Sequence, residues 1–380
     1  MKSLILFSLI FLTNLIVYSQ PYNHYYGNLH AHSDYSDGNI EFFDDYDTPY
    51  ESFNYAKKSK NFDFLGISEH NHSGAYTRGE PKDNDRPNPK DWQKGLKQAN
   101  QANEDGKFVC LYGQEWGTYD PGHVLIYGST KLMGWEQGNY EVKVEKGYYK
   151  TLFSIIAKDD NMIALLAHPT KYDMFNKLAK EPYNKVFDKA IVGVALRNGP
   201  HKAKENDYSV KQSRNFEGYY YTLLGKGYHL GASIDHDNHY TNFGRTTQSR
   251  LVVLAKSLTQ NDIMDALKNR RFFASDDWNV KIEFTLNSKI MGQISSGKSQ
   301  PKIKLKISDS SQDKVKTIEL LYGISGNNSK PKILKTYTDK NEISVDHKQE
   351  KNKEYYYLAK IIQVDGDIIW TSPIWYIVKD

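Results

Sequence analysis

The chain has 380 residues and a formal net charge of +4, from 50 basic and 46 acidic side chains. Its length allows one large domain and one small one, and a hydrophobic content of 39% allows a sizeable core. The weak, dispersed charge argues against a protein that binds nucleic acids or membrane surfaces through charge.

The first 20 residues have the features of a secretory signal peptide. Lys2 precedes an apolar run from Leu4 to Leu12, and a more polar stretch ends at Gln20. The run is too short for a comfortable bilayer span, so we expect residues 1–20 to be removed and no membrane span to remain. A lone cysteine, Cys110, allows no internal disulfide. Export without disulfides favours a bacterial periplasm or the medium outside the cell.

Strand-like and helix-like segments alternate in the next part of the chain, which we take as residues 21–278. The helix-like segments are 50–60, 92–104, 149–159 and 259–270. Several of the strand-like segments are continuous apolar runs, as in parallel strands buried on both faces. These segments are 25–29, 62–68, 108–113, 123–127, 162–167, 190–196 and 229–234. The alternation predicts an α/β barrel, and the absence of a Gly-rich loop after the first segment argues against a dinucleotide-binding fold.

The pattern changes to alternating apolar and polar residues from about residue 279. Six strand-like segments follow, separated by Gly, Ser, Asn and Asp: 280–286, 302–307, 315–322, 332–338, 354–362 and 368–378. They predict a β-sandwich of Ig-like size over residues 279–380, without a cluster of His, Asp and Glu. We expect it to brace the barrel; carbohydrate binding through exposed Tyr and Trp is the alternative.

Histidines and carboxylates gather where the predicted strands end, which is where α/β barrels carry their active sites. His30 and His32 are two residues apart in extended backbone, so both rings can reach one ion. Gly38 permits a sharp turn that returns Asp37 toward them. Six segments lie at strand ends: Gly27-Asn28-Leu29-His30-Ala31-His32, Ser36-Asp37-Gly38, Ser68-Glu69-His70, Gly113-Gln114-Glu115, Ala167-His168-Pro169 and Asp235-His236-Asp237-Asn238-His239. A seventh, Gly122-His123-Val124, opens a strand.

Two of these segments leave a choice of ligand. Glu69 points to the opposite side of its strand from His70, so we expect it to support a ligand rather than to bind metal. In the last segment, the spacing of Asp237 and His239 puts both on one side, and Asp235 with His236 is the rival pair. The carboxylate of Glu115 can bridge two ions, which an imidazole cannot do.

In this order, the motifs resemble the PHP (polymerase and histidinol phosphatase) superfamily, and most closely its exported branch of carbaryl-hydrolase-like metallohydrolases. The resemblance spans residues 25 to 275 and includes the later segments Phe243-Gly244-Arg245 and Arg271-Phe272-Phe273-Ala274. It implies a distorted (β/α)7 barrel with a trinuclear site. This chain departs from the commonest pattern at Glu69, where Asp is usual, and in the extra Asp235-His236.

The resemblance also implies which residues would hold each ion. His30, His32, Glu115 and Asp237 would hold the first. Glu115 would bridge to a second ion held by His123 and His168, and Asp37, His70 and His239 would hold the third. Two to three divalent ions are therefore expected. Histidine-rich ligation permits zinc, manganese or iron, and the sequence does not select among them.

Such a site suits hydrolysis of a phosphodiester or phosphomonoester by a metal-bridging hydroxide, with Glu115, Asp37, His70 and Asp237 as the central catalytic groups. The expected substrates are a small phosphoester or a phosphorylated glycan or lipid, rather than nucleic acid. Arg78, Lys171, Arg197 and Arg245 lie in loops near the motifs and are candidates for holding the phosphate.

Three alternatives remain open. The same hydroxide can attack a carboxyl or carbamate ester. A binding protein that keeps metal for structure and binds glycan through its sandwich is possible, although the complete ligand set argues against it. A proofreading nuclease is disfavoured by the signal peptide and the lack of a basic groove. Substrate identity, the choice between mono- and diesters, and oligomeric state are not readable.

Overall fold

The computed structural model describes residues 22–38, 48–71, 87–118, 122–135, 140–169, 178–199, 201, 203–212 and 214–380. The expected signal peptide and the phosphate candidates Arg78 and Lys171 lie outside these ranges. Within them, no helix combines the length and apolar character needed to cross a bilayer.

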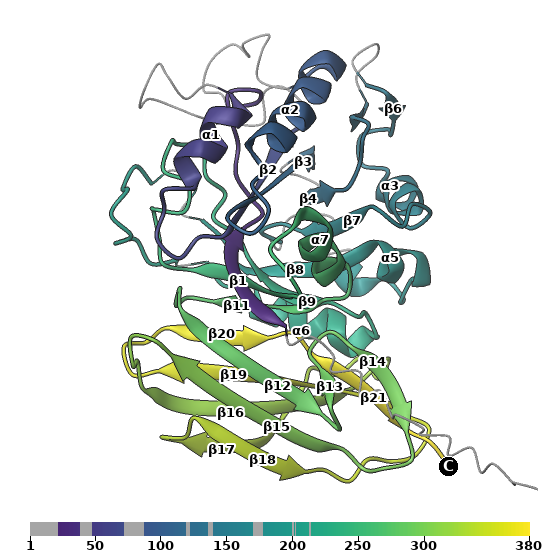
Figure 1. The fold of residues 1–380 in the computed structure, drawn as a ribbon. Coiled ribbons are helices and arrows are strands. Elements are labelled where there is room, and N and C mark those ends of the chain that lie inside the picture. Colours follow the sequence, from purple (N-terminus) through teal and green to yellow (C-terminus); the bar gives the residue numbers. More distant parts are fainter. Residues whose placement is uncertain are drawn as a thin grey trace, which may run out of the picture.

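The fold is mixed α/β and is built on one large sheet (Figure 1). All seven predicted strand segments overlap observed strands, which follow one another in the sheet as β1-β2-β3-β4-β7-β8-β9. Four adjacent pairs are parallel: β1 with β2, β2 with β3, β7 with β8, and β8 with β9. The bounds are β1 (Asn23–Asn28), β2 (Phe64–His70), β3 (Val109–Thr118), β4 (Gly122–Tyr127), β7 (Ile163–Leu166), β8 (Ile191–Arg197) and β9 (Gly231–Ile234).

Three strands depart from the expected parallel pattern. β4 is antiparallel to both β3 and β7, because only residues 119–121 connect it to β3 and a parallel pair needs a much longer crossover. β10 (Arg250–Ala255) and β11 (Phe272–Ser275) join the sheet beside β1 and were not predicted. β10 is antiparallel to both β1 and β11. Closure into a (β/α)7 barrel therefore stays a prediction.

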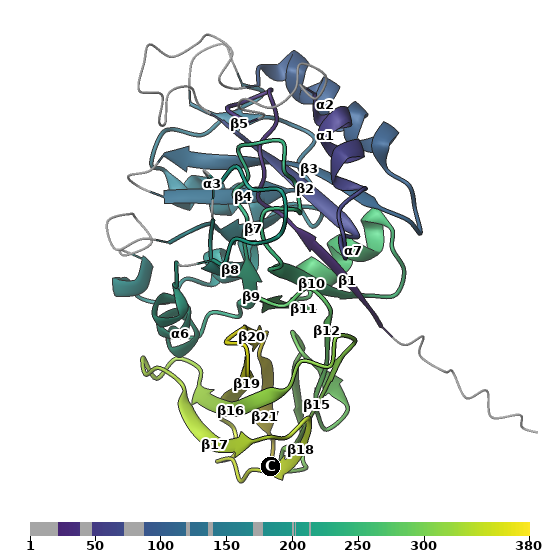
Figure 2. The same ribbon diagram turned by 90° about the vertical axis from the view of Figure 1, so that its left-hand side faces the viewer.

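Helices lie around the first part of the sheet (Figures 1 and 2). Their starts follow local capping chemistry: the Asn88 side chain accepts hydrogen bonds from two backbone amides of α2, and Thr259 accepts one from α7. The bounds are α1 (Pro49–Ala56), α2 (Pro89–Ala102), α3 (Tyr149–Ile156), α5 (Lys185–Ala190), α6 (Glu217–Lys226) and α7 (Gln260–Lys268). Two short strands, β5 (Met133–Gly134) and β6 (Val142–Lys143), pair with each other.

The C-terminal part contains two sheets with an apolar layer between them (Figure 2). One sheet consists of β12 (Val280–Leu286), β13 (Lys289–Ile290), β15 (Lys302–Asp309) and β18 (Glu342–Asp346). The other extends the large sheet, since β20 pairs with β11, and consists of β14 (Ile294–Gly297), β16 (Val315–Ile324), β17 (Lys332–Thr338), β19 (Glu354–Gln363), β20 (Ile368–Thr371) and β21 (Ile374–Val378). The predicted strand 368–378 is interrupted at Pro373, which has no backbone N–H to donate. Domain boundaries stay a prediction.

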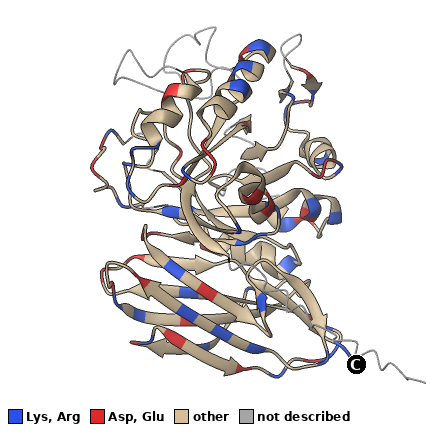
Figure 3. Cartoon of the chain, in the orientation of Figure 1, with Lys and Arg blue, Asp and Glu red and all other residues tan. Residues whose placement is uncertain are grey.

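Charged side chains of both signs mix along these C-terminal strands (Figure 3). One acidic group was not expected: Asp277, which follows β11, approaches Asp309 and Asp313. Burial and the neighbouring Asp309 raise the pKa of Asp277 to about 8. This group joins Asp277, which precedes the predicted sandwich segment, to two residues within that segment, so the sequence pattern did not reveal it.

His229 joins the two parts of the molecule through two carboxylates. Its Nδ1 lies 2.8 Å from Asp188 Oδ2, at α5, and its Nε2 lies 3.0 Å from Glu354 Oε1, in β19. Burial lowers the pKa of His229, but the hydrogen bonds to Asp188 and Glu354 outweigh burial and raise it to about 9. The protonated ring therefore stabilises the junction.

This pair of contacts predicts a pH-dependent part of the stability. The folded-state pKa of about 9 exceeds the ordinary value of 6.5, so the stabilisation is complete below pH 6.5 and is lost as the pH rises through 9. Replacing His229 by Phe should remove this part. We expect the difference in unfolding free energy between wild type and His229→Phe to shrink by roughly 2–3 kcal/mol across that interval, measured by denaturant titration. A constant difference would contradict the assignment.

Candidate metal centre

Glu115 is the centre of the site. It lies in β3, is completely buried, and faces five imidazole rings that arrive from different segments of the chain. Its Oε1 lies 3.1 Å from His30 Nε2, 2.8 Å from His123 Nδ1 and 3.0 Å from His168 Nε2, and its Oε2 lies 3.3 Å from His32 Nε2 and 3.2 Å from His70 Nδ1. One carboxylate thus has a separate set of rings on each oxygen, which is the arrangement that bridging two ions requires.

Asp237, rather than Asp235, faces the same space. Asp237 Oδ1 lies 3.2 Å from His30 Nε2 and 3.5 Å from His32 Nε2. Asp235 Oδ2 is instead 3.3 Å from Nδ1 of His30, the nitrogen on the far side of the ring. A carboxylate in that position orients a metal-binding imidazole and raises its basicity. The geometry therefore favours Asp237 as the ligand and Asp235 as the partner of His30.

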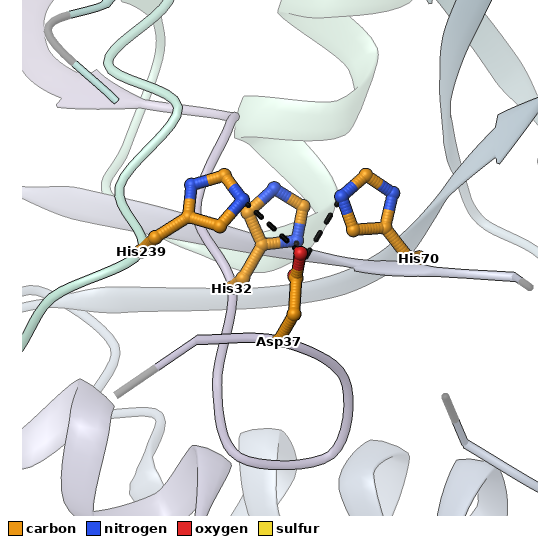
Figure 4. Close-up of side chains that lie close together, drawn as sticks. All are labelled: His32, Asp37, His70 and His239. Carbon is orange, nitrogen blue, oxygen red and sulfur yellow. Dashed lines mark ion pairs between the residues drawn. The ribbon is translucent and has the colours of Figure 1, made fainter. Parts of the chain in front are cut away.

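A second group of side chains lies beside Glu115 and is centred on Asp37 (Figure 4). Asp37 Oδ1 lies 3.8 Å from His32 Nδ1 and 3.6 Å from His70 Nε2, and Oδ2 lies 3.5 Å from His239 Nε2. The rings of His32 and His70 are stacked, with centroids 4.4 Å apart. His32 and His70 each contact both Asp37 and Glu115, so the two groups form one continuous site.

Strand ends explain why these residues meet. β1, β2 and β3 are parallel. His30 lies just beyond β1, His70 ends β2, and Glu115 lies within β3 directly beside His70. His168 and Asp237 follow β7 and β9 in the same way. His123 opens β4 rather than ending it, but β4 runs antiparallel, which brings its beginning to the same edge.

The charges in the site are strongly coupled. Burial raises the pKa of Glu115, but the imidazoles of His123, His30 and His70 outweigh burial and hold that pKa well below its ordinary value. Burial lowers the pKa of His32, but contacts with Asp237 and Glu115 raise it to about 10. The metal-free site therefore holds protons on His30 and His32, whose pKa values are raised. Since a metal must displace them, its affinity should fall as the pH is lowered.

The residues fit a set of divalent ions. Several buried polar atoms find no hydrogen-bond partner among the described residues: His30 Nε2, both ring nitrogens of His32, Asp37 Oδ1 and Glu115 Oε2. Such atoms are costly to bury unless something binds them, and imidazole with carboxylate suits zinc, manganese or iron. Three groups have atoms close enough to share an ion: His30, His32, Glu115 and Asp237; His70, Glu115 and His123; and His32, Asp37, His70 and His239.

These groups differ from the implied ligand sets in two respects. His32 and His70 each belong to two groups, so either ring is placed to serve neighbouring ions. His168 belongs to none of the three, although its Nε2 lies 3.3 Å from His123 Nδ1 and close to Glu115. The nine predicted ligands thus occupy one site, with His168 at its edge.

Asn198 is a site residue that the sequence did not reveal. It follows β8, is 2% exposed, and its Nδ2 donates a hydrogen bond of 3.0 Å to Asp237 Oδ2. This contact leaves Asp237 Oδ1 directed at His30 and His32. An isolated asparagine does not match any metal-ligand motif. Its position directly after an apolar strand was the only feature of the sequence that could have pointed to it.

The two arginines proposed to hold phosphate have other partners. Arg197 contacts Asp276 at 3.1 Å and lies over the Trp370 ring. Arg245 donates to Ser59 Oγ and lies over the Tyr55 ring. Their role in phosphate binding stays a prediction. The contacts above hold both guanidinium groups to residues other than the metal-ligand candidates.

Comparisons with known proteins give a limited result. No family model matches the sequence, and no curated protein matches it. Among solved structures, a two-domain protein from Bacteroides vulgatus containing a predicted PHP-like metal-dependent phosphoesterase has a TM-score of 0.44 and 15% identity, covering 90% of this chain and 96% of the other. The lesion-specific endonuclease EndoQ from Pyrococcus furiosus has a TM-score of 0.35 and 14% identity, covering 65% and 56%.

Proposed function

We propose that this chain is a metal-dependent phosphoesterase of the PHP type, and that it is exported. The observation that carries the proposal is the position of Glu115, buried among five imidazoles with Asp37 and Asp237 beside it. A fully buried set of this kind is expensive to fold without bound cations and well suited to hold them. The motifs of the PHP branch of exported hydrolases support the family assignment.

Ions bound in this site would supply an activated water molecule and polarise the ester to be cleaved. Glu115 and Asp237 would supply negative charge to the ions, and Asp235 would fix the His30 ring. Substrate would enter from the side on which the ligands reach solvent. The side chains of Asp37, His168 and His239 are 23%, 15% and 14% exposed, whereas the other six are below 10%.

The expected substrate is a small phosphoester or a phosphorylated glycan or lipid, and a proofreading role on nucleic acid is disfavoured. A carboxyl or carbamate ester is the second candidate, because the same nucleophile attacks carbonyl carbon. The arrangement in two C-terminal sheets would brace the catalytic part through β20 and β11.

The exposed position of His168 allows a direct test. We expect the metal-reconstituted protein to hydrolyse bis(p-nitrophenyl) phosphate or p-nitrophenyl phosphate, and chelation to abolish this turnover. His168→Ala should lower kcat/KM by about 100-fold or more, because the variant loses a ring at the Glu115 carboxylate. The preferred ester distinguishes a diesterase from a monoesterase.

His347→Gln, in the C-terminal part, is the matched control and should keep full turnover. Hydrolysis of p-nitrophenyl acetate without hydrolysis of either phosphate would replace the proposal by a carboxyl esterase. Absence of turnover on all esters by a protein that retains metal would favour a binding protein.

A further inference from the structure

Glu69 is a buried carboxylate beside the metal ligands that is not itself placed to bind an ion. It is the penultimate residue of β2, adjacent to His70, and is completely buried. It belongs to none of the three groups of candidate ligands. A buried carboxylate that lacks a function in binding or structure would be costly, so its partners need to be identified.

Within the described part of the chain, the hydrogen bonds to this carboxylate come from one turn. Ser33 donates through its backbone amide, at 3.2 Å, and through its hydroxyl, and Ser36 donates through its hydroxyl at 2.5 Å. Within the turn, Ser33 O accepts from Ser36 N at 3.1 Å and from Gly38 N at 3.0 Å. Glu69 therefore anchors the segment that contains Asp37.

The turn has little freedom to settle in another way. A Cβ atom at Gly38 would lie 2.1 Å from His32 O, so the end of the turn packs against the backbone at its start. The Ser33 amide, the two hydroxyls and the glycine leave Asp37 pointing at His32, His70 and His239 (Figure 4). Without the Glu69 carboxylate, three donors would lose their acceptor inside the protein.

We propose that Glu69 is a positioning residue that fixes Asp37 and thereby assembles the ion position formed by His32, Asp37, His70 and His239. It acts on that position and not on the one formed by His30, His32, Glu115 and Asp237, where Asn198 has the corresponding role toward Asp237. The inference rests on the proposed metal centre. It assigns Glu69 to the ion position around Asp37, and Asn198 to the ion position around Asp237.

The test is a measurement of bound manganese rather than of turnover. Full-length wild type, Glu69→Ala, Glu69→Gln and His239→Ala are dialysed against graded Mn²⁺, and bound metal per chain is measured. His239→Ala serves as the reference for loss of the Asp37 position. Glu69→Ala should weaken the same binding step as His239→Ala, by about 10–100-fold. Glu69→Gln should keep most of it, because the amide oxygen still accepts from Ser33 and the hydroxyls can rotate.

Double variants separate positioning from a general structural effect. Glu69→Ala combined with His239→Ala should bind as much metal as His239→Ala alone, because both act on one position. Glu69→Ala combined with Asn198→Ala should lose more than either single variant, because they act on different positions. Thermal unfolding of each metal-free variant checks the fold, and Ser36→Ala, with a smaller loss at the same step, replaces Glu69→Ala if that variant does not fold.

Wild-type binding by Glu69→Ala, or an equal loss at every step, would overturn the positioning role while leaving the metal centre intact. Absence of bound Mn²⁺ in wild type would instead refute the metal centre itself, and the positioning role with it.

Discussion

Replacing Glu115 by Ala is expected to reduce phosphoester turnover by more than about 100-fold, the upper range for residues that only support metal ligands. Glu115 contacts five imidazoles directly, three through Oε1 and two through Oε2. Its loss therefore removes a carboxylate that both sets of rings share. It also leaves the rings without the negative charge that raises the pKa of His30 and His32. Initial rates and bound metal, measured on the same samples, should fall together.

Glu354→Gln is the matched control, because Glu354 is a carboxylate that contacts a histidine outside the site. It should keep the turnover of wild type at a temperature where both are folded. If Glu115→Ala kept more than a tenth of the activity, Glu115 would not be the central group and the catalytic account would fail.

Replacing Arg250 by Met is expected to lower the free energy of unfolding by about 3–5 kcal/mol, because each buried acceptor that loses its donor costs about 1–3 kcal/mol and several lose it together. Arg250 is completely buried, and burial lowers its pKa to about 9. Among the described residues its guanidinium donates only to backbone oxygens, so a methionine would remove a donor from each of them, and only the Ser249 oxygen would keep a partner there, His236 Nε2. These oxygens belong to Lys60, Asn61, Gly244, Thr247 and Ser249, at 2.8–3.0 Å.

The measurement is urea unfolding of the metal-free protein, which keeps ion binding out of the comparison. Lys57→Met is the control, because Lys57 pairs with a half-exposed Glu104 and such surface pairs contribute about 0–1 kcal/mol. Equal losses for both variants would show that the Arg250 hydrogen bonds are not a main support of this loop.

The sequence predicted well those features that depend on local pattern. Strand-like segments, several of them continuous apolar runs, marked every strand from β1 to β9 except the two-residue strands β5 and β6. The histidines and carboxylates near the ends of these segments marked the edge at which Glu115 lies. Period-two alternation marked most of the C-terminal strands in the same way, but it missed the short strands β13, β14 and β18. Strand ends of parallel neighbours meet because of sheet geometry, so the gathering of His30, His70 and Glu115 followed once the strands were known.

Features that depend on tertiary contacts were not predictable from pattern. The direction of β4 depends on a connection of three residues, whereas its apolar sequence suits either direction. β10 is an apolar run like the others, but its place beside β1 is set by pairing across 220 or more positions in the chain. Asn198 acquires a role only because Asp237 lies opposite, and neither residue signals the other in sequence.

The most direct test of the metal centre is anomalous X-ray diffraction from crystals of the protein reconstituted with Mn²⁺. The account predicts two to three anomalous peaks, and each peak should lie within bonding distance of several of the nine predicted ligands. One peak should lie beside Asp37 and another between His30 and Asp237. A well-ordered site with no peak there, or peaks only elsewhere in the molecule, would contradict it.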